Sequence, residues 1–251
     1  MLEPKIIYAS KDFLVVNKPA GLLVHGSGIG HWVSGIGKTG KRKSKFPIPD
    51  TPYPTPEPTL VDWLLKKYPQ VAKVGDDPAQ RPGIVHRLDK ETSGVMLVAL
   101  NQKSFEYLKS LFIAHQIVKK YRAVIYGVPK KSEGIINAPI GIRNGTLKRS
   151  VRSSKMAKEA ITVYRVLKTW IALGADGKDQ KFSLVELTPK TGRTHQLRVH
   201  MMSIGNPIVG DPLYGPKKRP PWAKRLMLHA LAIAFVDPKG KSVQFETEDL
   251  F

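Results

Sequence analysis

The densest group of chemically capable side chains lies in residues 81–94, RPGIVHRLDKETSG, where Asp89 stands between Arg87 and Lys90. Apolar residues at 84–85 and 95–100 enclose the polar part, which predicts a strand, a turn and a second strand. A carboxylate can act as a nucleophile or a base when a nearby cation favours its ionised form and a pocket excludes water. The alternative for a single Asp in such a turn is an ordinary solvated ion pair.

Other kinds of catalytic site find little support in the sequence. There is no cysteine, which excludes disulfides, thiolate catalysis and cysteine-based metal sites. His195 and His200 are five residues apart rather than four, and His86 and His229 have no acid cluster nearby, so no metal is expected. The sequence contains no G-x-S-x-G segment, the pattern that would indicate a serine nucleophile. Residues 35–39, GIGKT, resemble the end of a phosphate-binding loop, but Trp32 occupies the position that requires glycine.

The composition points to a folded protein that binds nucleic acid. Lys and Arg number 41 against 20 Asp and Glu, a formal charge of +21, and hydrophobic residues make up 41% of the chain. Such an excess suits a surface that neutralises many phosphates, although a basic, solvated surface is the alternative. No signal peptide and no apolar segment long enough to span a bilayer are evident, so we expect a cytoplasmic protein without a membrane partner.

Apolar periodicity predicts the elements that would position these residues. Strands are expected at 5–9, 13–18, 117–126, 160–167, 182–187, 226–235 and 243–245, and helices at about 60–68, 102–112 and 195–204. Thr59 and Asn101 are the expected N-caps of the first two helices. Thr194 or Thr191 is the expected cap of the third helix, which Gly205 ends.

Two basic segments interrupt this pattern. Residues 26–58 are rich in Gly, Lys and Pro and predict a flexible, partly extended loop. Residues 141–158 carry many Lys and Arg side chains before the first acid, Glu159. This one-sided charge favours a hairpin or arm that contacts phosphate over a merely solvated loop.

The segment 81–94 resembles the signature H-R-L-D-x-x-T-S-G of the RluA-type RNA pseudouridine synthases. Further blocks are similar to that family in the same order: 12–25 with the core KPAG, 119–124, 191–200 continuing to 210–211, and LHA at 228–230. Together they extend from about residue 5 to about residue 236, so the resemblance covers nearly the whole chain.

The resemblance implies an α+β pseudouridine synthase fold, in which helices flank a curved, mixed, mostly antiparallel sheet with a central catalytic cleft. It implies a single catalytic domain over residues 1–251 that includes the 26–58 loop. Relatives often carry a small RNA-binding domain before this one; no N-terminal accessory domain is expected here. The implied enzyme is an isomerase that flips a uridine out of structured RNA and converts it to pseudouridine without a cofactor. Its RNA is expected to be rRNA, with tRNA as the alternative, and the protein is expected to be a monomer.

By the same resemblance, Asp89 is the essential acid, Arg198 its cationic partner and Tyr121 the ring that stacks on the target base. Arg193 could supply the cation instead. Residues expected to bind or position RNA, or to line the pocket, are His86, Arg87, Leu88, Thr92, Arg193, His195 and Leu228. The chemical route of the carboxylate stays open: attack on the sugar, attack on the base, or removal of a sugar proton. A catalytically silent RNA-binding ribosome-assembly factor and a base-excising hydrolase are the rival functions.

Overall fold

The structure is a computed structural model that describes residues 2–26, 57–142 and 148–251. Its helices are α1 (Leu60–Lys67), α2 (Gln102–Ile113) and α3 (Gln196–Ser203), and a short 3-10 helix spans Pro69–Lys73. Its strands are β1 (Lys5–Ala9), β2 (Phe13–Lys18), β3 (Ser93–Ala99), β4 (Val118–Tyr126), β5 (Glu133–Asn137), β6 (Gly141–Ile142), β7 (Arg149–Ser150), β8 (Ile161–Leu173), β9 (Asp179–Pro189), β10 (Leu228–Val236) and β11 (Ser242–Glu246).

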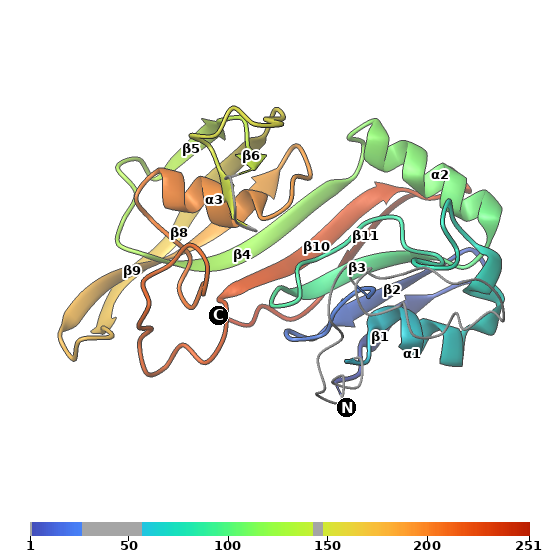
Figure 1. Ribbon diagram of the computed structural model, residues 1–251, viewed down its shortest axis with the longest axis horizontal. Helices are drawn as coiled ribbons and strands as arrows, with labels where there is room; N and C mark the ends of the chain where they lie inside the picture. Colours follow the sequence, from blue (N-terminus) through green and yellow to red (C-terminus); the bar gives the residue numbers. More distant parts are fainter. Residues whose placement is uncertain (1, 27–56, 143–147) are drawn as a thin grey trace, which may run out of the picture.

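One large sheet runs through the described part of the chain in the order β1-β2-β3-β10-β4-β9-β8-β5, with β11 paired to β10 (Figure 1). Among these pairs only β3 and β10 run parallel. β6 and β7 form a separate small hairpin. The expected fold class, a mixed and mostly antiparallel sheet flanked by helices, is therefore confirmed.

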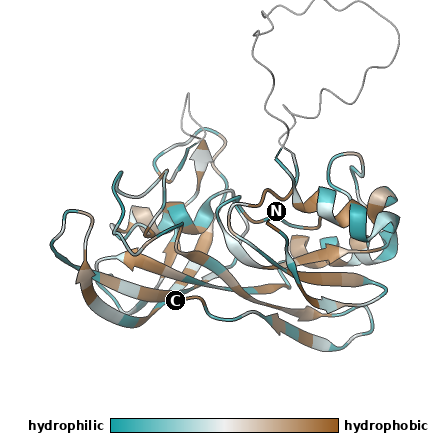
Figure 2. Ribbon diagram, turned by 90° about the horizontal axis from the view of Figure 1, so that it is seen from below, coloured by the Kyte–Doolittle hydropathy of each residue, from teal (hydrophilic) through white to brown (hydrophobic). Residues whose placement is uncertain are grey.

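Alternate side chains of the strands bury opposite faces of the sheet. Leu14 and Val16 of β2 pack in one cluster with α1, whereas Phe13 and Val15 pack in another with α2. Accordingly, Figure 1 shows α2 above and α1 below strands β1 to β3. Apolar residues concentrate on the strands, whereas the loops are largely hydrophilic (Figure 2). Tyr121 of β4 contacts both the α1 cluster and the α3 cluster, so it lies where the two halves of the sheet meet.

The parallel pairing of β3 with β10 joins these halves. Gly94 has φ +118°, and a Cβ there would collide with the backbone of Ala230 on the neighbouring strand, so only glycine fits without strain. Beside it, Ser93 Oγ lies 2.8 Å from His229 Nδ1 and accepts a hydrogen bond from Arg225 Nη1 at 3.1 Å. The turn that carries Asp89 leads directly into the start of β3, where β3 pairs with β10.

Two local predictions are wrong. Residues 84–85 form no strand: Ile84 makes one isolated bridge to Val98, and the backbone N–H of Leu97 donates to His86 Nε2 at 2.9 Å. That side chain takes the place of a further backbone pairing. The N-cap of α3 is His195, in the left-handed conformation with φ 58°, rather than Thr194 or Thr191.

Other local predictions are confirmed. Thr59 forms a capping box with Asp62, and Asn101 caps α2. β8 and β9 extend well beyond the expected limits and form a long hairpin.

The expected loop at 26–58 lies almost wholly outside the described residues, and so does part of the expected basic arm, 143–147. In the described residues no helix has both the length and the apolar character needed to cross a membrane.

Candidate active site

A cleft of about 540 Å³ lies between the Asp89 turn, the start of α3, strand β4 and the end of α2. Elements from distant parts of the chain form its walls. The cleft brings together all ten residues that the sequence singled out: His86, Arg87, Leu88, Asp89, Thr92, Tyr121, Arg193, His195, Arg198 and Leu228.

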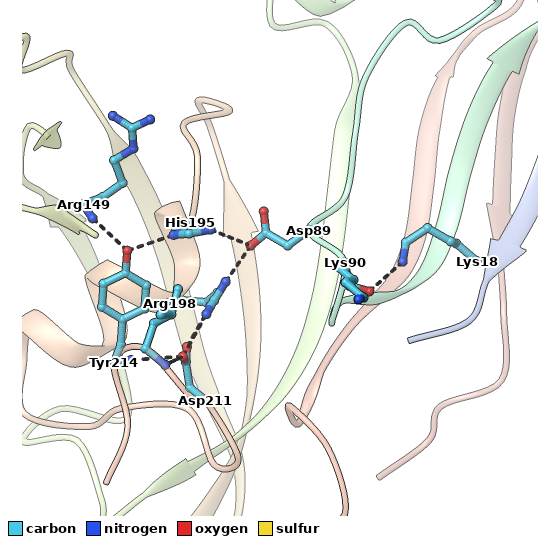
Figure 3. Close-up of polar contacts among 9 residues, drawn as sticks. Lys18, Asp89, Lys90, Arg149, His195, Arg198, Asp211 and Tyr214 are labelled. Atoms are coloured by element: carbon cyan, nitrogen blue, oxygen red, sulfur yellow. Dashed lines mark hydrogen bonds and ion pairs between the residues drawn. The ribbon is translucent and has the colours of Figure 1, made fainter. Parts of the chain in front are cut away.

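Asp89 reaches into the cleft and meets a cation from α3 (Figure 3). Arg198 Nη1 donates to Asp89 Oδ2 at 3.0 Å, and the side chains are 4% and 23% exposed, respectively. The neighbouring cations have other partners, because Lys90 pairs with Glu57 at 2.6 Å and Arg87 Nη1 lies 3.3 Å from His25 Nε2. Asp89 therefore does not form the ordinary ion pair with a neighbour in the sequence.

A second carboxylate fixes the guanidinium of Arg198. Asp211 is fully buried and accepts from Arg198 Nε at 2.7 Å and from Nη2 at 2.8 Å. It also accepts from the backbone N–H groups of Leu213 and Tyr214. Burial by itself would lower the pKa of Arg198, but hydrogen bonding to Asp211 and the charges of both carboxylates raise it above its usual value. Arg198 therefore stays a cation with a fixed direction, and one of its nitrogens remains for Asp89.

His195 and Tyr214 form a third contact to this group. Tyr214 Oη lies 2.8 Å from His195 Nδ1 and accepts from the backbone N–H of Arg149 at 2.9 Å, while its ring lies under the Arg198 guanidinium. Burial lowers the pKa of His195, which favours the neutral imidazole. When the Tyr214 hydroxyl donates to Nδ1, the proton of the neutral ring lies on Nε2. Nε2 is 3.9 Å from Asp89 Oδ2, so its N–H faces the carboxylate.

Tyr121 and Leu228 form an apolar wall of the same cleft. They come from adjacent strands, and Leu228 is 3% exposed whereas Tyr121 is half-buried. Burial, followed by the negative charge of Asp89, raises the pKa of the Tyr121 phenol, which therefore stays protonated at neutral pH. An aromatic face beside a carboxylate is an arrangement that can receive a planar base.

Lys18 holds the Asp89 turn from behind. Its ammonium group is fully buried and donates to the carbonyl oxygens of Pro19, Leu22 and Lys90 at 2.8–3.0 Å. Burial lowers the pKa of Lys18 to about 8, against the raising effect of nearby acids. The backbone N–H of Thr92 donates to the Asp89 carbonyl at 3.1 Å and closes the turn.

The remaining predicted residues line the cleft in supporting positions. Arg193 donates through Nε to the Glu159 carbonyl at 2.8 Å, so it is Arg198 rather than Arg193 that pairs with Asp89. Leu88 belongs to the buried core beneath the turn. In the part of the chain that the structure describes, no group of three or more His, Cys, Asp or Glu side chains could hold a metal ion.

Sequence reasoning missed the roles of Asp211, Tyr214 and Lys18. Asp211 and Lys18 fell inside blocks that were recognised, but only as parts of a pattern. A signal was available for Asp211, because an acid in a loop is uncommon in a chain with twice as many basic residues as acidic ones. For Tyr214 we find no such signal.

Comparisons with known proteins agree with this geometry. The family described as RNA pseudouridylate synthase matches residues 12–203. The chain is 37% identical to an uncharacterised RNA pseudouridine synthase of Bacillus subtilis, over 98% of this chain and 69% of that protein. It is 34% identical to ribosomal large subunit pseudouridine synthase D of Zymomonas mobilis, over 97% of this chain and 68% of that protein. Among solved structures, human RNA pseudouridylate synthase domain containing 1 is similar with a TM-score of 0.71 and 29% identity, covering 100% of this chain and 85% of that one.

Proposed function

The chain belongs to the RNA pseudouridylate synthase family, isomerases that act on RNA, and from this premise we propose that Asp89 is the essential carboxylate with which it converts specific uridines to pseudouridine. The RluA-type family expected from the sequence is thereby confirmed. One observation carries the proposal for Asp89: its carboxylate enters the cleft beside Tyr121 and hydrogen-bonds to an arginine that a second, buried carboxylate holds in place.

The reaction rearranges one nucleotide and requires neither an oxidant nor a reductant. The bond from N1 of uracil to C1′ of the ribose breaks, the uracil turns, and C5 bonds to C1′. C5 then releases its proton and N1 takes one up, so that no proton is gained or lost overall. Asp89 is the nucleophile or base placed to assist this exchange, and Arg198 with His195 stabilises the negative charge of its carboxylate. The protonated Tyr121 supplies the face on which the uracil stacks.

The target uridine must leave its stack before it can reach Asp89. Unstacking a nucleotide costs a few kcal/mol, and stacking on an aromatic side chain returns about 1–3 kcal/mol per base. Tyr121 therefore offsets much of the cost of base flipping. Arg87, exposed at the rim of the cleft, is placed to contact the RNA around the vacated position.

We propose large-subunit rRNA as the substrate in preference to tRNA, because relatives of Zymomonas mobilis and Pseudomonas aeruginosa carry the name ribosomal large subunit pseudouridine synthase D. The net charge of +21 suits a large, folded RNA. The single domain and the monomeric state stay predictions.

The direct test is to map pseudouridines in total RNA from cells with and without the gene, and then to restore either wild type or Asp89→Asn. Wild type should restore the lost pseudouridines and Asp89→Asn should not, although the variant should still bind RNA. An active Asp89→Asn enzyme would refute the assignment. Unchanged pseudouridines in the deletion strain would favour a silent RNA-binding factor, and release of free uracil in vitro would favour a base-excising hydrolase.

A further inference from the structure

The cleft continues past Asp89 toward the end of α2, where its chemistry changes. This distal end is lined by His86, Lys109, Phe112, Ile113 and Lys119. The reaction proposed above uses none of these side chains to make or break a bond.

Lys119 brings a positive charge to this end. By strand alternation it lies on the same face of β4 as Tyr121, two residues away, or about 6.7 Å along the strand. In the described residues no carboxylate lies within ion-pair distance of its ammonium group, which sits 5.8 Å from the centre of the Phe112 ring. Lys109 differs, because Asp76 pairs with it at 2.8 Å.

His86 brings an N–H donor. Its Nε2 accepts the backbone N–H of Leu97 at 2.9 Å, so the proton of the neutral ring resides on Nδ1. Burial and the nearby charge of Lys119 lower the pKa of His86 to about 3, so the ring stays neutral. The ring stacks on Phe112 at 4.6 Å. In the described chain no protein acceptor takes the Nδ1 proton, which is available to a ligand in the cleft.

We propose that Lys119 and His86 Nδ1–H form a phosphate-binding subsite for the nucleotide next to the target uridine. A cation and a neutral donor without a nearby acid suit a phosphodiester, and the spacing from Tyr121 suits the backbone of a nucleotide adjoining the stacked base. Ile113, 68% exposed at the same end, provides an apolar contact for the ribose or base of that nucleotide. The assignment of the bound chain as RNA rests on the proposed function.

The test measures how RNA affinity depends on salt. The proteins are wild type, Lys119→Met, Lys119→Arg and the matched control Lys120→Met, whose side chain is exposed and points to the opposite face of β4, toward Glu186. The probe is a short, fluorescently labelled single-stranded RNA containing one uridine. Losing one phosphate contact should reduce the slope of log K against log salt by about 0.7.

We expect this reduction for Lys119→Met, near-wild-type behaviour for Lys119→Arg, and little change for Lys120→Met. Equal slopes for Lys119→Met and wild type, or equal reductions in Lys119→Met and Lys120→Met, would overturn the subsite. ¹⁵N NMR of labelled histidines should show His86 protonated on Nδ1, with that resonance moving when the RNA is added. Protonation on Nε2, or an Nδ1 resonance that the RNA leaves unmoved, would remove His86 from the subsite.

Product formation on unmodified large-subunit rRNA separates this idea from the proposed function. If wild type makes pseudouridine and Lys119→Met raises KM while kcat stays close to wild type, both stand. If wild type makes pseudouridine but the salt slopes are equal, the subsite fails and the function stands. If wild type makes none on rRNA or tRNA while the slopes differ as expected, the phosphate site stands and the proposed function fails.

Discussion

Replacing Asp211 with asparagine would remove the buried charge that directs Arg198 toward Asp89. The Asp211 side chain is fully buried and that of Arg198 is 4% exposed, so neither charge has ready access to water. Removing one partner of such a pair typically costs about 3–5 kcal/mol. Asparagine keeps one oxygen for hydrogen bonding, so we expect the lower end, about 3 kcal/mol in the free energy of unfolding. For a chain of this size that corresponds to a decrease in Tm of roughly 6–12 °C.

The pH dependence gives the same prediction a second form. Burial would raise the pKa of Asp211, but the hydrogen bonds and charge of Arg198 lower it below its usual value. A carboxyl group with a lowered pKa in the folded state contributes stability above its unfolded pKa, about 3.9, and loses it as the pH falls through the folded value. The stability difference between wild type and Asp211→Asn should therefore be complete at neutral pH and shrink below about pH 4.

Urea denaturation followed by circular dichroism would measure both effects, and pseudouridine formation would report the displacement of Arg198. Asp249→Asn is the control, because Asp249 also accepts from an arginine, Arg122, but is 39% exposed. Its loss should cost at most about 1 kcal/mol. Equal unfolding free energies for wild type and Asp211→Asn at pH 7, or full activity of the variant, would refute the reasoning.

Three further changes test other parts of the site. Lys18→Met removes three hydrogen bonds, including one to the Lys90 carbonyl in the Asp89 turn, and should cost about 3 kcal/mol by urea denaturation at about 1 kcal/mol per bond. The pKa of Lys18 in the folded state, about 8, lies below its value in the unfolded state, so between these two pH values the folded protein binds fewer protons than the unfolded one. The stability of wild type relative to Lys18→Met should therefore rise as the pH rises above about 8. A fall would contradict the lowered pKa of Lys18. Gly94→Ala places a Cβ against the Ala230 backbone and should lower Tm strongly, whereas Gly240→Ala, strained but in open space, should lower it less; equal losses would contradict the close approach. Tyr121→Ala should weaken binding of uridine-containing RNA by about 1–3 kcal/mol in a fluorescence anisotropy titration while Tyr121→Phe retains affinity, and equal losses would refute the stacking role.

Local structure followed closely from the sequence where the signal is itself local. The N-caps Thr59 and Asn101 act through groups three residues away, and the expected strand at 117–126 corresponds closely to β4. The prediction failed at His86, whose side chain accepts from the backbone of β3, and at the start of α3, where His195 takes the N-cap position and its side chain contacts Tyr214 instead of capping the helix. Thr191, an expected cap, instead donates its hydroxyl proton to Gln196 and accepts from the backbone of Ile161 on β8.

The sequence by itself determined the family, the excess of basic residues, the absence of thiol chemistry and ten of the residues that line the cleft. These properties belong to residue types and their order along the chain. The resemblance named Arg198 as the cationic partner of Asp89, with Arg193 as the alternative, and the tertiary structure decided between them: Arg198, 109 residues from Asp89 along the chain, donates to its carboxylate, whereas Arg193 donates to the Glu159 carbonyl. Only the tertiary structure showed that Asp211 orients Arg198. A contact between distant residues depends on the packing of the sheet and leaves no trace in their spacing.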